Sequence, residues 1–348
     1  MTYLVLPLGA KFKDRAIWNS ILERMERRLM SWKQLYLSKG GKITLIKNTL
    51  SSLPTYFLSL FPIPMDIAIR IERLQRNFLC GGVDESPKFR LVKWAQVCSP
   101  LQSSSLGIRN LRTFNQVLLG KWLWRYGRET THLWKRVIET KYGNDWEGWC
   151  TKEVSNPYGV SLWTIRQGWP AFSKSIQFEV GVGDITKFWH HVWCGSCTLR
   201  EAFLELYNIS CNKEPSIADV MHFPNQKLHW NLLFSKAPQD WETEHFYTFL
   251  DLINSMPLNG EGQDKKCWES AGNNNFKVSE YYLSLSSTPD ISFPWKPVWH
   301  SKVPPRVAFF SWTAALGKIL TIENLWYKGV VVVDWCYICK KSEELGNW

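Results

Sequence analysis

The sequence predicts a mainly α-helical protein with small β elements. Apolar residues recur at helical spacing through most of residues 1–145, and strand-like patterns are confined to short segments near residues 3–8 and 178–189. Hydrophobic residues make up 45% of the 348 positions. A chain of this length and composition can bury a sizeable core, and its length indicates two or three domains.

The first predicted helix has an apolar face and a charged face. Apolar residues follow a four-residue step at Ile17, Ile21, Met25 and Leu29. The charged residues between them fall on other faces, which predicts an amphipathic helix with a charged outer face. These charged residues are Glu23, Arg24, Glu26, Arg27 and Arg28.

Two more helices are predicted before residue 82. Ser38, Lys39 and the Gly40–Gly41 pair supply turn chemistry, after which a helical period resumes. The second helix is expected to bury Ile43, Ile46 and Leu50. The third is expected to begin near Pro64, to end at a Gly81–Gly82 cap and to bury one stripe of side chains. That stripe consists of Ile67, Ile71, Leu74 and Phe78.

A long helix rich in aromatic residues is predicted after residue 110. Its broad apolar face consists of Leu111, Phe114, Leu118, Leu119, Trp122 and Leu123. The basic residues of this segment are available to solvent or to phosphate: Arg109, Arg112, Lys121, Arg125 and Arg128. One further helix is marked by Trp134, Val137 and Ile138. Packing is the favoured role of the aromatic residues, because Trp and Leu at helical spacing usually form core.

The composition changes to Gly, Pro, Ser and Trp near residues 145–165, which predicts a domain boundary. A β-hairpin is predicted near 178–189, with its two strands joined across Gly183 and Asp184. Residues 200–290 indicate a small helical packing unit. Four residues after the hairpin have metal-like spacing, but packing and loop roles are favoured over a zinc site there. They are His190, His191, Cys194 and Cys197.

Positive charge is concentrated in the N-terminal part. Residues 1–150 hold 24 Lys and Arg against 11 Asp and Glu, whereas residues 151–348 hold 18 against 20. A basic helical surface suits phosphate contacts, which dominate nucleic-acid affinity. The alternative is a basic face that is merely solvated.

Membrane and secretory classes are not expected. No apolar run approaches the roughly 20 residues that span a bilayer. Nine cysteines without disulfide-scaffold spacing, and no secretory leader after Met1, predict reduced thiols inside a cell.

Several motifs resemble those of plant non-LTR (LINE-type) retrotransposon reverse transcriptases. YLVLPLG at 3–9 resembles the strand that ends the catalytic palm, with Val5 in place of the usual Gly. Trp32–Lys33, LSKGG at 37–41 and LPTYFLSLFPIP at 53–64 are similar to the thumb-like helices that follow the palm. The likeness continues through LWKRVIETKYG at 133–143 and covers nearly the whole chain.

The resemblance implies four regions. They are a remnant palm strand at 1–10, a basic thumb-like helical domain at 11–145, an aromatic-rich connection region with the hairpin at 146–290, and a truncated zinc-binding-type domain at 291–348. In this family the palm carries an Asp-Asp pair that holds two metal ions for nucleotidyl transfer. The sequence contains no Asp-Asp pair. The resemblance therefore implies a chain that is not itself an enzyme.

The C-terminal segment resembles the family's zinc-binding domain. Its first helix is expected to bury Val307, Phe309, Phe310, Trp312 and Leu316, and a second helix is expected over Leu320–Trp326. Cys336 and Cys339 supply two thiolates, whereas the His and Cys that follow in the family are absent. No cofactor is expected, because two ligands alone hold zinc weakly.

Three functional interpretations follow. The first is a nucleic-acid-binding C-terminal fragment that lacks the palm and contacts RNA, RNA/DNA hybrid or DNA through phosphates, without base readout. The second is a part of an RNA-directed DNA polymerase whose palm lies in another chain. The third is a pseudogene-derived, aromatic-rich interaction or structural protein without a nucleic-acid role.

The first interpretation has named candidate contacts. They are Arg24, Arg27, Arg28, Lys33, Lys39, Lys42 and Lys47. The resemblance favours the nucleus over the cytoplasm, and the sequence carries no indication of oligomeric state.

Overall fold

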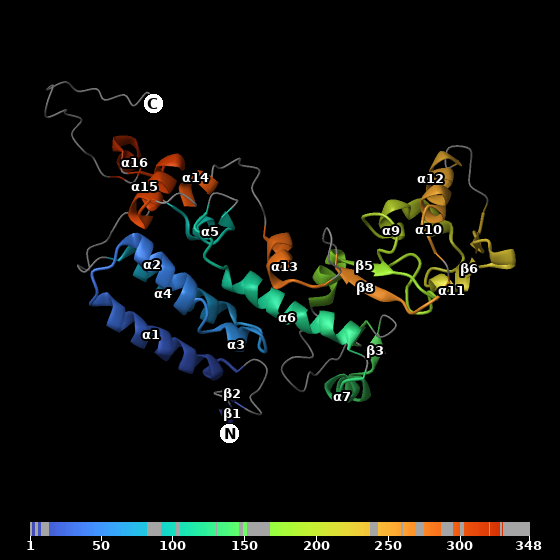
Figure 1. Cartoon of the computed structure of the whole chain (residues 1–348), viewed down its shortest axis with the longest axis horizontal. Helices are drawn as coiled ribbons and strands as arrows, with labels where there is room; N and C mark the ends of the chain where they lie inside the picture. Colours follow the sequence, from blue (N-terminus) through green and yellow to red (C-terminus); the bar gives the residue numbers. More distant parts are fainter. Residues whose placement is uncertain are drawn as a thin grey trace. The chain divides into compact units, whose positions relative to one another are not determined.

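The computed structural model describes residues 2–3, 6–7, 14–81, 92–101, 105–129, 131–145, 149–151, 168–236, 243–258, 260–268, 275–286, 295–299, 303–319, 321–327 and 329. Over these residues the fold is mainly helical with small two-stranded sheets, which confirms the predicted class (Figure 1). Contacts divide the chain into two compact units, each built from separate segments. The aromatic unit draws on Met1–Asp14, Phe57–Pro62 and Phe114–Leu285, and the basic unit on Arg15–Tyr56, Ile63–Thr113 and Ser286–Trp348. These units cut across the ranges 11–145, 146–290 and 291–348 that the sequence indicates.

Helices form the basic unit. Its elements are η1 (Ala16–Trp18), α1 (Asn19–Lys33), α2 (Lys39–Leu45), the π-helical η2 (Ile46–Leu50), α4 (Met65–Cys80), α5 (Trp94–Val97), α14 (Trp295–Trp299), α15 (Pro305–Ala315) and α16 (Ile322–Trp326). α4 packs against both α1 and α2, and α15 packs against α2 (Figure 1). The short helix α3 (Thr55–Leu58) spans the point where the chain passes between units.

The predicted apolar faces of the basic unit are largely confirmed. Ile17, Ile21, Met25 and Leu29 are all buried, and so are Ile43, Ile46 and Leu50. In α4 the prediction fails at one place, where Leu74 is half-buried and Gln75 is fully buried instead. The reason is geometric, because a four-residue step from Ile67 through Ile71 reaches Gln75 before the stripe resumes at Phe78.

The predicted glycine turn at 38–41 is instead the start of α2. Ser38 is the N-cap, and its Oγ accepts a hydrogen bond from the Gly41 N–H at 3.2 Å. Position 40, in the first turn of α2, requires glycine because a side chain there would overlap Pro305 of α15. The third helix also ends differently from the prediction. Gly81 has an extended conformation, with φ −67° and ψ 142°, and is not a left-handed cap.

The aromatic unit contains short elements around one long helix. They are β1 (Thr2–Tyr3), β2 (Leu6–Pro7), α6 (Leu111–Arg128), α7 (Leu133–Tyr142), β3 (Asn144–Asp145), β4 (Cys150–Thr151), η4 (Ser173–Ser175), β5 (Ile176–Glu179), α9 (Leu199–Ala202), α10 (Leu204–Ile209), α11 (Ile217–Val220), β6 (Met221–His222), η5 (Pro224–Gln226), β7 (His229–Trp230), α12 (Thr243–Asn254), β8 (Lys265–Trp268) and α13 (Val278–Leu285). Three residues of α6, Leu111–Thr113, belong to the basic unit.

Aromatic side chains fill the core of this unit, as the sequence predicts. Trp189 stacks on Phe249 with ring centroids 5.7 Å apart, and Trp268 packs edge-on against Phe276 at 4.9 Å. The buried tryptophans of this core are Trp124, Trp149, Trp169, Trp189, Trp193 and Trp268.

The predicted hairpin at 178–189 is wrong. β5 pairs antiparallel with β8, so that Ile176 lies opposite Trp268, and Thr186–Trp189 forms no strand. The buried Asp264 carboxylate, just before β8, accepts hydrogen bonds from the backbone N–H groups of Gly181 and Gly183, both at 2.8 Å, and from Thr186 Oγ1 at 2.5 Å. This carboxylate holds residues 181–186 as a loop and prevents them from forming the expected turn.

Two further predictions need correction. The single strand expected over residues 3–8 is two short strands, with Thr2–Tyr3 antiparallel to Leu6–Pro7. In α15, Val307 and Phe310 are 46% and 61% exposed, and the helix buries Ala308 and Trp312. None of the helices in the described ranges is both long and apolar enough to cross a membrane.

Candidate nucleic-acid interface

Three arginines form an exposed row on α1. Arg27 and Arg28 each lie about one helical turn after Arg24, and all three are exposed because the opposite face of α1 is buried. The acidic residue nearest in sequence to two of them is already engaged, since Glu26 pairs with Arg70 of α4 at 2.9 Å. Within the described residues no ion pair involves these three arginines. With the exposed Glu23 beside Arg24, the row still carries more positive than negative charge.

A hollow of about 250 Å³ lies where α1, α2 and α4 meet. Three of the predicted lysines line it, together with three aromatic rings: Lys33, Lys39, Lys42, Trp32, Tyr36 and Phe78. Trp32 and Phe78 pack with ring centroids 5.8 Å apart, and Tyr36 is 98% exposed. The sequence predicts the lysines as contact residues but gives the aromatic residues no role at this site. The Trp-Lys-x-x-Tyr pattern at 32–36 was the available signal.

The predicted lysines are not equivalent. Lys33 and Lys39 are exposed, and Lys39 Nζ lies 4.9 Å from the Phe309 ring centroid. Lys42 Nζ donates a hydrogen bond to the Gly81 carbonyl at 2.5 Å and lies 5.6 Å from the Phe78 ring centroid. Burial lowers the pKa of Lys47, which lines neither the hollow nor the arginine row. Lys33 and Lys39 are thus the lysines most accessible to a phosphate.

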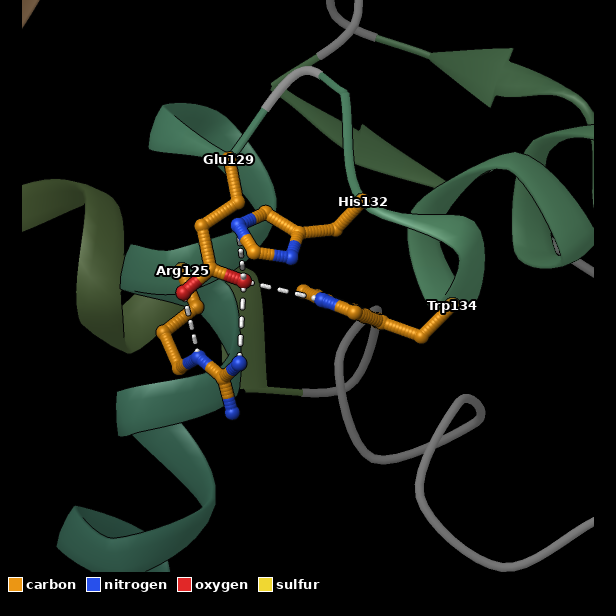
Figure 2. A network of polar contacts seen from close by, with 4 residues as sticks. All are labelled: Arg125, Glu129, His132 and Trp134. Atoms are coloured by element: carbon orange, nitrogen blue, oxygen red, sulfur yellow. Dashed lines mark hydrogen bonds and ion pairs between the residues drawn. The ribbon is translucent and has the colours of Figure 1, made fainter.

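Arg125, which the sequence placed among the basic residues available to phosphate, is bound within the aromatic unit. Its Nε and Nη2 donate to the Glu129 carboxylate at 2.6 and 2.9 Å, and Trp134 Nε1 donates to the same carboxylate at 2.8 Å (Figure 2). The guanidinium carbon lies 5.0 Å from the Trp122 ring and 5.3 Å from the Trp134 ring. The hydrogen bond from Arg125 holds the pKa of Glu129 below its usual range. This network ties the end of α6 to the start of α7.

Of the histidines and cysteines at 190–197, His191 and Cys194 are buried, whereas Cys197 is exposed. His191 stacks on Phe178 with ring centroids 4.2 Å apart, and its Nδ1 accepts the Lys187 N–H at 2.9 Å. Burial raises the pKa of Cys194 to about 12, so its thiol is protonated at neutral pH. Among the residues that the structure describes, no cluster of three or more His, Cys, Asp or Glu could hold a metal ion.

The predicted zinc half-site, Cys336 and Cys339, lies outside the described residues. In the segment 276–347 the only other Cys or His in the sequence is His300, which also lies outside them. A structural zinc ion takes four Cys or His ligands. Cys336, Cys339 and His300 are the residues of these two types in the segment.

Comparisons with known proteins relate the C-terminal segment to reverse transcriptases and nearly the whole chain to a protein named for ribonuclease H. Residues 276–347 match the family described as zinc-binding in reverse transcriptase. The chain is 26% identical over 356 residues to an Arabidopsis thaliana protein provisionally named a ribonuclease H protein, an alignment that covers 97% of this chain and 54% of that protein. An uncharacterised mitochondrial protein of Arabidopsis thaliana is 26% identical over 143 residues, which cover 41% of this chain and 92% of that protein.

The chain spans about half the length of the relative named for ribonuclease H. Its similarity to that relative extends over almost all of its own residues, whereas the zinc-binding match is confined to the C-terminal segment. These matches agree with the resemblance carried by the motifs at 3–9, 32–64 and 133–143. Residues 276–347 are therefore a segment of the reverse-transcriptase zinc-binding type, and the chain as a whole is similar to the Arabidopsis thaliana protein named for ribonuclease H.

Proposed function

We propose that the chain binds nucleic acid through the basic unit, as a thumb-like part of a LINE-type reverse transcriptase. The arginine row of α1 and the exposed Lys33 and Lys39 contact phosphates of an RNA/DNA hybrid or a related duplex. Contacts of this kind contribute affinity and position the protein on the duplex, but they do not read the base sequence. The printed sequence holds no Asp-Asp pair, so the proposal assigns binding and not polymerisation to these residues, and it needs no cofactor.

The distribution of charge between the units carries the proposal. The segments of the basic unit hold 23 Lys and Arg against 11 Asp and Glu, whereas those of the aromatic unit hold 19 against 20. The positive excess of the chain thus belongs to the unit that contains α1 and α2. A duplex attracts such a surface from a distance and releases counterions on contact, which is the main source of sequence-independent affinity.

The experiment measures affinity for a fluorescent RNA/DNA hybrid across a salt series. Wild type is compared with a triple variant, Arg24→Gln, Arg27→Gln and Arg28→Gln. A plot of the logarithm of the association constant against the logarithm of the salt concentration has a negative slope. The slope becomes shallower by about 0.9 for each phosphate-contacting arginine that the variant loses. The variant therefore binds more weakly, and most clearly at low salt. Affinity that does not depend on salt would contradict the electrostatic basis of the proposal.

A control of equal charge separates local contact from net charge. Lys174, Lys227 and Lys236 are exposed and belong to the aromatic unit. Changing all three to Gln lowers the net charge by the same amount as the arginine variant. The control is expected to keep the wild-type slope, and an equal loss in both variants would place the binding surface elsewhere.

A further inference from the structure

The hollow beside the arginine row combines cations with aromatic surface in a way that phosphate binding alone does not require. Lys33, Lys39 and Lys42 line it, but so do the rings of Trp32 and Tyr36. Tyr36 is 98% exposed, although Leu35 and Leu37 line the same hollow. The Tyr36 ring is therefore available for contact with another molecule at this hollow.

The size and charge of the hollow restrict its occupant. Its volume of about 250 Å³ lies below the about 300–1,000 Å³ of pockets that enclose drug-sized ligands. One planar ring system fits such a space better than an extended peptide. Two exposed lysines at the same site, Lys33 and Lys39, favour an occupant that brings negative charge with its ring. A nucleotide satisfies both conditions, because its base is flat and its phosphate is anionic.

The lysines divide into two roles at this hollow. Lys42 is held by the Gly81 carbonyl and lies against the Phe78 ring, so it fixes the end of α4 as one wall. Lys33, at the last residue of α1, and Lys39, at the first residue of α2, are exposed on either side of Tyr36 in the chain. They are placed to meet a phosphate while the ring between them meets a base.

We propose that this hollow binds one unpaired nucleobase next to the duplex, stacked on Tyr36 and Trp32, with its phosphate on Lys33 and Lys39. Proteins that bind single strands combine a basic groove with aromatic platforms in this way, and stacking accepts any base because each has a flat face. The inference rests on the proposed function and adds a preference to it: a hybrid with a single-stranded overhang binds more tightly than the same hybrid with blunt ends.

The test compares these two probes at one salt concentration, with 2-aminopurine as the first unpaired base of the overhang. Stacking one base contributes about 1–3 kcal/mol in comparable proteins, so wild type is expected to prefer the overhang by about 5- to 150-fold and to quench the 2-aminopurine. Tyr36→Ala removes the preference and the quenching but keeps the affinity for the blunt hybrid. Tyr36→Phe retains both, because the ring and not the hydroxyl carries the contact.

Tyr327→Ala is the matched control, since Tyr327 is 86% exposed in the basic unit but does not line the hollow. It is expected to behave as wild type. If the chain binds both probes equally and Tyr36→Ala changes nothing, the base site is refuted while the phosphate surface stands. If neither probe binds, the proposed function itself fails. Competition by a poly-glutamate peptide that depends on Tyr36 would overturn the assignment to a base.

Discussion

His191 shows how burial of one side chain links the fold to pH. Its ring is only 3% exposed, and burial lowers its pKa from about 6.5 to about 3, with Lys266, His190 and Lys187 adding repulsion of positive charge. The unfolded ring takes up a proton near pH 6.5, whereas the folded ring does not until about pH 3. The stabilising contribution of the neutral ring is thus fully present above pH 6.5 and is lost as the pH falls through this window.

The expected result is a fall of about 2 kcal/mol in the free energy of unfolding of wild type between pH 6.5 and 5. Most carboxylates titrate below this range, so a histidine dominates it. His191→Asn removes the titration, and its Oδ1 can replace Nδ1 as acceptor for the Lys187 N–H. The variant is less stable at neutral pH, because it loses the stack on Phe178, but its stability changes less between pH 6.5 and 5.

Urea unfolding at a series of pH values measures this slope. His229→Asn is the control, because His229 is exposed and its ring is solvated in both the folded and the unfolded state. It is expected to keep the wild-type slope. An unchanged slope in His191→Asn would show that another group causes the acid sensitivity.

Residue spacing predicted burial well where one helix face meets one core. The four-residue step at Ile17, Ile21, Met25 and Leu29 is local information, and all four side chains are buried. Residue spacing did not predict the environment of Arg125. Its partners, Glu129 and Trp134, are placed by the connection between α6 and α7. From sequence alone, a charged residue on a predicted helix face is expected to be solvent-exposed. Its actual partners become known only from the fold.

At the scale of elements, the start of α2 depends on two adjacent glycines with opposite roles. A Cβ on Gly40 would overlap the Pro305 side chain and lie 3.0 Å from the Pro305 carbonyl carbon, which is backbone and cannot move aside. A Cβ on Gly41 would meet nothing closer than Ser38 Oγ at 3.6 Å, an ordinary contact. The close approach of α15 to α2 therefore requires glycine at position 40 only.

Gly40→Ala is expected to lower the free energy of unfolding by about 1–3 kcal/mol, the usual cost of overpacking. Gly41→Ala is expected to raise it by up to about 1 kcal/mol, because alanine is the better helix former. Thermal or urea unfolding of the two variants gives the comparison. The same sign of change in both variants would refute the packing of Pro305 on Gly40.

The two glycines also show what the sequence could and could not predict about elements. A Gly-Gly pair normally signals a turn, and only contact with α15, more than 260 residues later in the sequence, makes it part of a helix. The hairpin failed for the same reason. Asp264 holds the 181–186 loop from 78 to 83 positions away, and β5 finds its partner in β8. Local patterns predict helices, whereas pairings between distant segments need the fold.

At the scale of the whole molecule, the fold sorts charge by unit and not by position in the chain. The sequence predicted a basic N-terminal part from 24 Lys and Arg against 11 Asp and Glu in residues 1–150. The structure assigns 286–348 to the same unit as α1 and α2, and it assigns most of 114–150 to the aromatic unit. The aromatic unit is left nearly neutral, at 19 against 20. The excess of positive charge is therefore a property of one unit.

Lysine footprinting tests this localisation in the intact chain. Bound RNA/DNA hybrid is expected to slow acetylation of Lys33 and Lys39 by about tenfold when the free hybrid is at ten times its Kd, because only about one chain in eleven is then unbound. The exposed Lys174, Lys227 and Lys236 of the aromatic unit should react at an unchanged rate, since that unit has no excess of positive charge to attract a phosphate backbone. High salt should restore the reactivity of Lys33 and Lys39, because it releases the hybrid. Equal protection of all five lysines would mean that the nucleic acid contacts both units, and protection confined to the aromatic unit would contradict the assignment of binding to α1 and α2.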